Sequence, residues 1–239
     1  MVRVLTLANE REVTEAAARR VAAEASAKPE LVLGVATGRT MVPFYDALAR
    51  LHRAGGLDLA RARSFNLDEL LLPAGHPKSF RAYMEMHAWS RIGLDRERCS
   101  IPDQSADPPI ECARYEGELA AAGGFDLAVI GVGADGHVAY NLPGPPHVGM
   151  HVVELPEAVA DSLHVPAAHR PLRALTLGFG ALASARRLLL LATTAEKARA
   201  VRALVDGPKD PRWPCTLLRE HPDFDVLVTP EACGDVSRS

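Results

Sequence analysis

The sequence is poor in aromatic residues and has no strong net charge. Aromatic side chains make up 5% of the 239 residues, and the formal net charge is −3, with a pI near 6.3. This balance provides no basic field of the kind that attracts nucleic acid or anionic lipid. We therefore expect no nucleic-acid partner, and any anionic ligand must be bound by local groups.

Cysteine and long apolar runs are also scarce. The cysteines are widely spaced, with no CxxC pair and no His or Cys companion at metal-ligand spacing, which predicts reduced thiols and no metal site. They are Cys99, Cys112, Cys215 and Cys233. The longest apolar runs, 127–131 and 188–192, are too short to span a bilayer, so we expect no membrane partner and a cytoplasmic location.

What the sequence does contain is an alternation of short runs rich in Val, Leu and Ile with longer stretches of helical period. This pattern is typical of an α/β protein with a doubly wound, mostly parallel sheet and helices on both faces, a modified Rossmann-like arrangement. The chain length suits a single domain over residues 1–239. The predicted strands are 2–7, 31–35, 63–67, 125–131, 152–155, 174–177, 188–192 and 225–228. The clearest predicted helices are 10–27, 41–52, 79–89, 109–122 and 195–206. The stretch 143–150, with three prolines and two glycines, is predicted to be an irregular loop.

In open parallel sheets, ligands bind beyond the carboxyl ends of the strands, so the loops that follow the strands are the place to seek chemistry. The second predicted strand is followed by Thr37, Gly38, Arg39 and Thr40 just before a predicted helix. Small residues and a helix N-terminus suit an anion, and Arg39 favours that interpretation. The alternative is an ordinary turn in which Thr40 is the N-cap.

Two adjacent carboxylates, Asp68 and Glu69, follow the third predicted strand. A carboxylate in a cleft is partly desolvated, which raises its pKa towards values that suit a general base. The alternative is a solvated turn in which one of the two caps a neighbouring element.

The loop after the fourth predicted strand contains Asp135 and His137, close enough for the carboxylate to orient the imidazole. Gly131, Gly133 and Gly136 in the same loop match the GxGxxG pattern of dinucleotide-binding proteins. A proline-rich stretch follows within about one turn and would stop the helix that such a fingerprint requires, so we expect no nicotinamide cofactor.

Lys197 follows the strand predicted over 188–192. Thr193 and Glu196 have the spacing of a capping box, which predicts that Lys197 lies in the first turn of a helix. A cation there opposes the helix dipole unless an anion lies nearby, and this favours a ligand contact.

Taken together, these segments resemble the glucosamine-6-phosphate deaminase (isomerase) and 6-phosphogluconolactonase superfamily across nearly the whole chain. The order of the motifs carries the resemblance, which is closer to the deaminase branch. The segments are 33–40 (LGVATGRT), 65–69 (FNLDE), 76–80 (HPKSF), 131–137 (GVGADGH), 195–198 (AEKA) and 214–222 (PCTLLREHP).

The resemblance implies roles for particular residues. Asp68 would move a proton between adjacent sugar carbons, and His137, oriented by Asp135, would open the sugar ring. The substrate would be a small phosphorylated sugar, with no metal or organic cofactor, and a homo-oligomer is left open. The residues implied in holding the phosphate or substrate are Thr37, Gly38, Arg39, Thr40, Gly136 and Lys197.

The chain departs from the deaminase pattern at two positions. Leu142 stands where deaminases carry a glutamate that assists the histidine, and Leu163 stands where a phosphate-binding arginine is expected. One hypothesis is that Arg39 supplies the charge missing at Leu163. Reduced or altered activity is a further expectation.

Three functions follow as alternatives. The first is isomerisation with deamination of an amino-sugar 6-phosphate, favoured by Asp68 and Glu69 in their motif. The second is hydrolysis of a 6-phosphogluconolactone, favoured by Leu142 and Pro143, with His137 as the base that activates water. The third is a sugar-phosphate-binding protein without turnover.

Overall fold

The computed structural model describes residues 2–234 and contains a central sheet whose seven strands all pair in parallel. The strands lie in the order β1-β10-β9-β6-β2-β3-β5. Their bounds are β1 Val2–Thr6, β2 Val32–Val35, β3 Arg63–Asn66, β5 Cys99–Ser100, β6 Leu127–Gly131, β9 Leu188–Ala192 and β10 Phe224–Val228.

The direction of winding reverses in the middle of this sheet. From β1 at one edge the chain crosses to β2, continues outward to β3 and β5, and then returns to β6 on the other side of β2. Right-handed crossovers in two opposite directions place helices on opposite faces. This confirms the doubly wound fold expected from the sequence, and β2 and β6 flank the point at which the winding direction switches.

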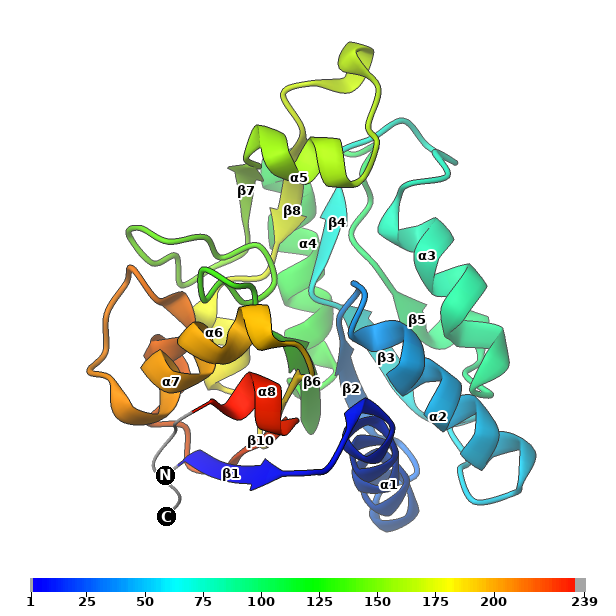
Figure 1. Cartoon of the computed structure of the whole chain (residues 1–239). Helices are drawn as coiled ribbons and strands as arrows, with labels where there is room; N and C mark the ends of the chain where they lie inside the picture. Colours follow the sequence, from blue (N-terminus) through cyan, green and yellow to red (C-terminus); the bar gives the residue numbers. More distant parts are fainter. Residues whose placement is uncertain (1, 235–239) are drawn as a thin grey trace.

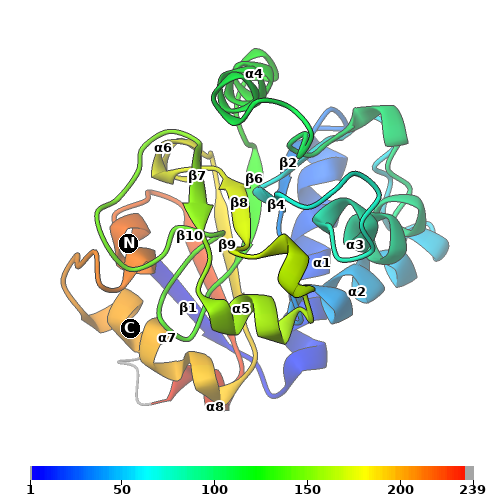
Figure 2. The ribbon, with the colours of Figure 1, turned by 90° about the horizontal axis from the view of Figure 1, so that it is seen from above.

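Helices cover both faces of the sheet. Helices α1, α2 and α3 lie together on one side, while α4, α6 and α7 lie on the other (Figures 1 and 2). The helices are α1 Glu10–Ala27, α2 Met41–Arg53, α3 Phe80–His87, α4 Pro108–Ala121, α5 Glu157–Ser162, α6 Phe179–Ala183, α7 Ala198–Asp206 and α8 Pro230–Cys233. Among the described residues, no helix is long and apolar enough to cross a membrane.

Three aromatic residues pack together where β3 meets α4. The ring of Phe65 lies 5.8 Å from the ring of Tyr115 and 6.4 Å from that of Phe125, both edge-on. The Tyr115 hydroxyl donates a 2.8 Å hydrogen bond to the carbonyl of Asn66, the last residue of β3. Aromatic packing therefore fixes the carboxyl end of β3, where the candidate site begins.

Two predicted strands do not join the central sheet. They correspond to β7 (His151–Glu154) and β8 (Arg173–Thr176), which pair with β4 (Asp68–Leu70) in a separate antiparallel sheet. In Figure 1 this small sheet stands above the carboxyl ends of the parallel strands, beneath α5. Nothing in the predicted pattern assigns these two strands to a separate sheet.

Leu67 links the two sheets. The strand predicted over 63–67 ends at Asn66, and the backbone N–H of Leu67 donates to the carbonyl of Val35 in the central sheet. The carbonyl of Leu67 accepts from Leu177, just beyond β8. The chain turns at this residue, so that Asp68 becomes the first residue of β4.

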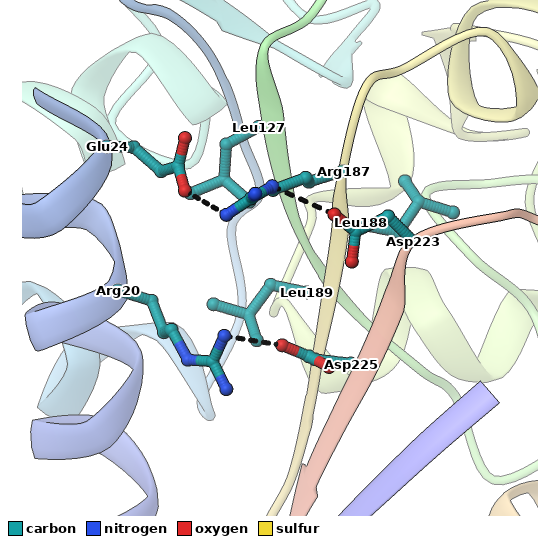
Figure 3. A pocket seen from close by; sticks show the side chains of 8 residues that line it. All are labelled: Arg20, Glu24, Leu127, Arg187, Leu188, Leu189, Asp223 and Asp225. Carbon is teal, nitrogen blue, oxygen red and sulfur yellow. Dashed lines mark hydrogen bonds and ion pairs between the residues drawn. The ribbon is translucent and has the colours of Figure 1, made fainter. Parts of the chain in front are cut away.

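The amino ends of the parallel strands carry a shallow hollow lined by charged side chains (Figure 3). Arg187 pairs with Glu24 of α1 and with Asp223, the latter at 2.8 Å. Arg20 of α1 pairs with Asp225 at 2.9 Å. These charges neutralise one another and join α1 to the sheet, at the end opposite the loops that contain the predicted site residues.

Candidate active site

The turn after β2 is open on its outer side. Its carbonyl oxygen at Gly38 accepts a 2.8 Å hydrogen bond from the Tyr83 hydroxyl of α3. Gly38 has a φ of +112°, and no atom lies within 4 Å of the place where its Cβ would stand. Thr37 and Thr40 are half-buried. Thr40 occupies the N-cap position of α2, but its side chain makes no capping hydrogen bond, which leaves its hydroxyl available to a ligand.

Asp68 is a buried carboxylic acid with an unpaired oxygen. It lies opposite Thr176 in the β4–β8 pair and is 6% exposed. Its Oδ1 atom has no hydrogen-bond partner among the described residues. Burial, with a smaller contribution from the neighbouring Glu69 carboxylate, raises the pKa of Asp68 to about 8. A carboxylate with this pKa is a strong general base when ionised.

Glu69 has a structural task. Its two carboxylate oxygens accept hydrogen bonds of 2.7 to 2.8 Å from the backbone N–H groups of Leu70, Phe80 and Arg81. It thereby caps the N-terminus of α3 from a fully buried position. The alternative of a capping carboxylate therefore applies to Glu69, whereas Asp68 caps nothing.

The contact predicted between Asp135 and His137 is present. His137 Nδ1 lies 2.7 Å from Asp135 Oδ1, and the backbone N–H of His137 donates to the same oxygen. Partial burial alone would raise the pKa of Asp135, but the hydrogen bond and charge of His137 hold that pKa below its ordinary value. The side chain of His137 is 31% exposed. If Nδ1 donates to the carboxylate, Nε2 is left free for a ligand.

Two glycines of the loop make this pair sterically possible. A Cβ on Gly133 would stand 2.2 Å from two atoms of the His137 ring and 2.6 Å from Asp135 Oδ1. Gly136 has a φ of +85°, and its Cβ would stand 3.0 Å from the ring of Trp213. No α-helix follows β6 in this loop, so the GxGxxG pattern serves a tight turn here.

Lys197 reaches into the same loop. Its Nζ donates a hydrogen bond to the carbonyl of Val132. Burial lowers the pKa of Lys197, while the charge of Glu196 raises it and that of Arg39 lowers it. Arg39 is 93% exposed and lies 3.4 Å from Glu196. The two cations, Lys197 and Arg39, are therefore neighbours across the turns that follow β9 and β2.

The predicted capping box is wrong. The Thr193 hydroxyl contacts Glu10 Oε1 at 3.0 Å, and the N-cap position belongs to Thr194, whose side chain makes no capping bond. Glu196 is exposed and pairs with a cation instead. Lys197 ends the 3₁₀ turn Ala195–Lys197 and stands immediately before α7.

The carboxylate at 68 and the imidazole at 137 are connected through β8. The backbone N–H of Tyr140 donates a 3.0 Å hydrogen bond to the hydroxyl of Thr176, the register partner of Asp68. The Asn141 side chain donates to the carbonyl of Leu177 at 2.8 Å. The loop that carries His137 is therefore attached to the small sheet that carries Asp68.

The structure thus gathers the predicted site residues at one rim. These residues lie just after the carboxyl ends of β9, β6, β2 and β3, and these four strands are consecutive neighbours in the sheet. Sequence reasoning missed Tyr83, Tyr140 and Thr176, which complete this rim. No spacing or motif signals them, because each is brought in by pairing between distant segments.

The two unusual leucines lie at different places. Leu142 is half-buried in the loop after β6, and Leu163 follows the last residue of α5. Both pack against the hydrophobic core. Between residues 2 and 234, no group of three His, Cys, Asp or Glu side chains is placed to hold a metal ion.

Fold and site together define a doubly wound α/β protein in which the predicted acid–base residues and the predicted anion turn lie around the switch in winding direction. The chain belongs to the family of glucosamine-6-phosphate isomerases and 6-phosphogluconolactonases, whose model matches residues 8–227. This confirms the superfamily expected from the motifs.

Individual relatives agree with this placement. The chain is 37% identical over 237 residues to a glucosamine-6-phosphate deaminase of Bacillus velezensis, covering 97% of this chain and 98% of the relative. It is 39% identical to glucosamine-6-phosphate deaminase 1 of Giardia intestinalis, over 90% of this chain and 84% of the relative.

One solved structure agrees with this family, and a second has the same fold. A monomeric glucosamine-6-phosphate deaminase superposes with a TM-score of 0.91 at 34% identity, over 97% of this chain and 98% of that one. The 6-phosphogluconolactonase of Trypanosoma brucei has a TM-score of 0.79 at 22% identity, over 99% of both chains. The second likeness shows the fold alone.

Proposed function

We propose that this protein isomerises and deaminates an amino-sugar 6-phosphate, converting glucosamine 6-phosphate and water into a ketose 6-phosphate and ammonia. The single observation that carries the proposal is the buried Asp68, whose pKa lies near 8, at the same rim as the His137–Asp135 pair. The similarity to deaminases over nearly the full chain supports the same substrate class.

The geometry suits this reaction in three respects. His137, held by Asp135, exchanges a proton with the ring oxygen and opens the pyranose. Asp68 then moves a proton from the second carbon of the open chain to the first. Lys197 and the turn Thr37–Thr40 hold the phosphate and fix the register of the chain against Asp68, and Gly136 lets the loop approach the sugar closely.

Ammonia release tests the proposal. Purified protein is incubated with glucosamine 6-phosphate, and both ammonia and the ketose phosphate are measured. Equal amounts of the two products are expected, and no ammonia at any substrate concentration would refute the function. The turnover number from the same assay tests whether Leu142 and Leu163, which carry no charge, make this enzyme slower than relatives with polar residues there.

Lactone hydrolysis is the second candidate. The His137–Asp135 pair could activate a water molecule, and the apolar Leu142 places no competing carboxylate beside it. Hydrolysis of 6-phosphogluconolactone above its spontaneous rate, without ammonia release from the amino sugar, would favour this function. Binding of both compounds without turnover would indicate a sugar-phosphate-binding protein.

Replacing Lys197 with Met should raise KM about 10- to 100-fold and leave kcat within about threefold, because the variant loses a charge-assisted contact to the phosphate. Lys209, an exposed lysine paired with Glu220, provides the control variant Lys209→Met. Steady-state kinetics of ammonia release distinguish the two parameters. A fall in kcat at unchanged KM would exclude a phosphate anchor.

Arg39→Ala should raise KM by a smaller factor, about 3- to 10-fold, because this side chain is almost fully exposed and solvent screens its charge. The same kinetic assay measures the change. An unchanged affinity for the sugar phosphate would refute the idea that Arg39 compensates for Leu163.

The pH dependence of kcat/KM should follow the ionisation of Asp68. A base must be deprotonated to act, and the pKa of Asp68 in the free protein is about 8. The rate constant should therefore rise about tenfold per pH unit below pH 8 and level off above it. Initial rates at constant ionic strength measure this. A rising limb centred near pH 4 would show that an ordinary carboxylate is the base.

A further inference from the structure

Tyr140 lies among the acid–base side chains but has no part in the reaction described so far. Its ring stacks on Phe80 of α3, with 5.9 Å between centroids and 17° between planes. The ring of His137 is also near, tilted by 33° with its centroid 6.2 Å away. The side chain is 9% exposed, so its position is fixed by packing.

The hydroxyl of Tyr140 is left unused by the protein. It makes no hydrogen bond within residues 2–234, although the backbone N–H of the same residue is bonded to Thr176. It is also not among the fully buried polar atoms that lack a partner, so it remains in contact with solvent. A rigid ring therefore presents a free hydroxyl in the neighbourhood of Asp68.

Burial and the nearby carboxylates keep the hydroxyl of Tyr140 protonated. Burial raises its pKa, and the carboxylates of Asp68 and Glu69 raise it further. A phenol in this state donates a hydrogen bond and does not accept a proton at neutral pH. The residue thus differs in kind from Asp68 and His137, both of which can exchange protons.

We propose that the Tyr140 hydroxyl is the hydrogen-bond donor to the sugar oxygen that becomes negative when Asp68 takes a proton from the neighbouring carbon. The assignment rests on the proposed function. As Asp68 accepts the proton, the C–H electron pair forms a carbon–carbon double bond, and the carbonyl electron pair moves onto oxygen. Asp68 then returns the proton to the first carbon, the amino nitrogen shares its electron pair with the second carbon to form an iminium, and a proton lost by that iminium neutralises the oxygen. Tyr140 stabilises the intermediate charge without giving up its own proton.

The variant Tyr140→Phe isolates the hydroxyl, because the ring keeps its stacking on Phe80. We expect kcat for ammonia release to fall about a hundredfold, the effect typical of a lost oxyanion donor, with KM within about threefold of wild type. Thermal unfolding should be nearly unchanged. Tyr83→Phe is the matched control, because it also removes one phenolic hydroxyl. The Tyr83 hydroxyl donates to the carbonyl of Gly38 in the proposed phosphate turn, so its loss should change KM.

A binding experiment tests the donor without turnover. The probe is the hydroxamate of a 5-phosphorylated five-carbon aldonic acid, whose anionic end imitates the charged intermediate. Calorimetry should show at least tenfold weaker binding of the hydroxamate to Tyr140→Phe, with unchanged binding of inorganic phosphate.

The outcomes separate the donor from the proposed function. Absence of ammonia with the wild-type protein refutes the function, while a weaker hydroxamate complex of the variant still supports the donor. Equal kcat and equal hydroxamate affinity in wild type and variant overturn the donor and leave the function intact. Failure of the wild-type protein to bind the hydroxamate also overturns it.

Discussion

Replacing Asp68 with Asn should lower kcat for ammonia release about a thousandfold and at the same time stabilise the folded protein. The loss of activity follows from the removal of the general base, whose contribution is on the order of 10²- to 10⁴-fold. The amide has nearly the shape of the carboxyl group but cannot accept the proton. Because Asp68 makes no hydrogen bond through Oδ1, the substitution breaks few contacts.

The gain in stability follows from the raised pKa of Asp68. In the unfolded chain this carboxyl ionises near pH 4, whereas in the folded protein it ionises near pH 8. The stabilising contribution of the neutral Asp68 carboxyl is therefore fully present below pH 4 and is lost as the pH rises to 8. Ionisation costs the folded state on the order of 5 kcal/mol above that pH, at about 1.4 kcal/mol per pH unit.

The measurement is thermal or urea unfolding of both proteins between pH 4 and pH 9. The Asn variant retains a buried amide at a cost of about 1–3 kcal/mol, so we expect a net gain of roughly 2–4 kcal/mol at pH 9 and a loss of about 1–3 kcal/mol at pH 4, where Asp68 is neutral in the folded protein. Asp58→Asn, in an exposed turn, provides the control and should show no such trend. A variant that keeps a tenth of the wild-type kcat would exclude Asp68 as the base.

The fold was predictable because its strongest signals are local. The central strands are short apolar runs between helical stretches, and six of the eight predicted strands overlap strands of the parallel sheet. The separate antiparallel sheet was not predictable in this way. No local pattern states which sheet a strand joins, and the placement of these strands depends on the turn at Leu67, where one residue bonds to both sheets.

The site was predictable only in part, for a similar reason. Asp68, His137 and Lys197 follow predicted strands, so the rule that parallel strands present their carboxyl ends at one rim was enough to group them. The roles of Glu69 and Tyr140 depend on contacts between segments distant in sequence. Glu69 meets the N-terminus of α3, and Tyr140 meets Phe80. No pattern in one sequence encodes those pairings.

Gly133 offers the second large effect, because it is the residue that leaves room for the His137–Asp135 pair. Gly133→Ala would place a methyl group 2.2 Å from the His137 ring and 2.6 Å from Asp135 Oδ1. The backbone can accept alanine, since φ is not positive at this position, so the ring must move and not the chain. Because a displacement of about 1 Å at a reacting group can cost 10²-fold in rate, we expect kcat to fall about a hundredfold with the melting temperature little changed.

Gly131→Ala is the matched control two residues earlier in the same motif. Its methyl group would meet only Met41 Cε at 3.4 Å, an ordinary contact, and its kinetics should stay close to wild type. The mechanism is tested by combining Gly133→Ala with His137→Ala. If the methyl group acts only by displacing the imidazole, it has no further effect once the imidazole is gone, so the double variant should match His137→Ala alone. A further loss of kcat in the double variant would mean that Gly133 maintains the conformation of the loop, independently of the position of the imidazole.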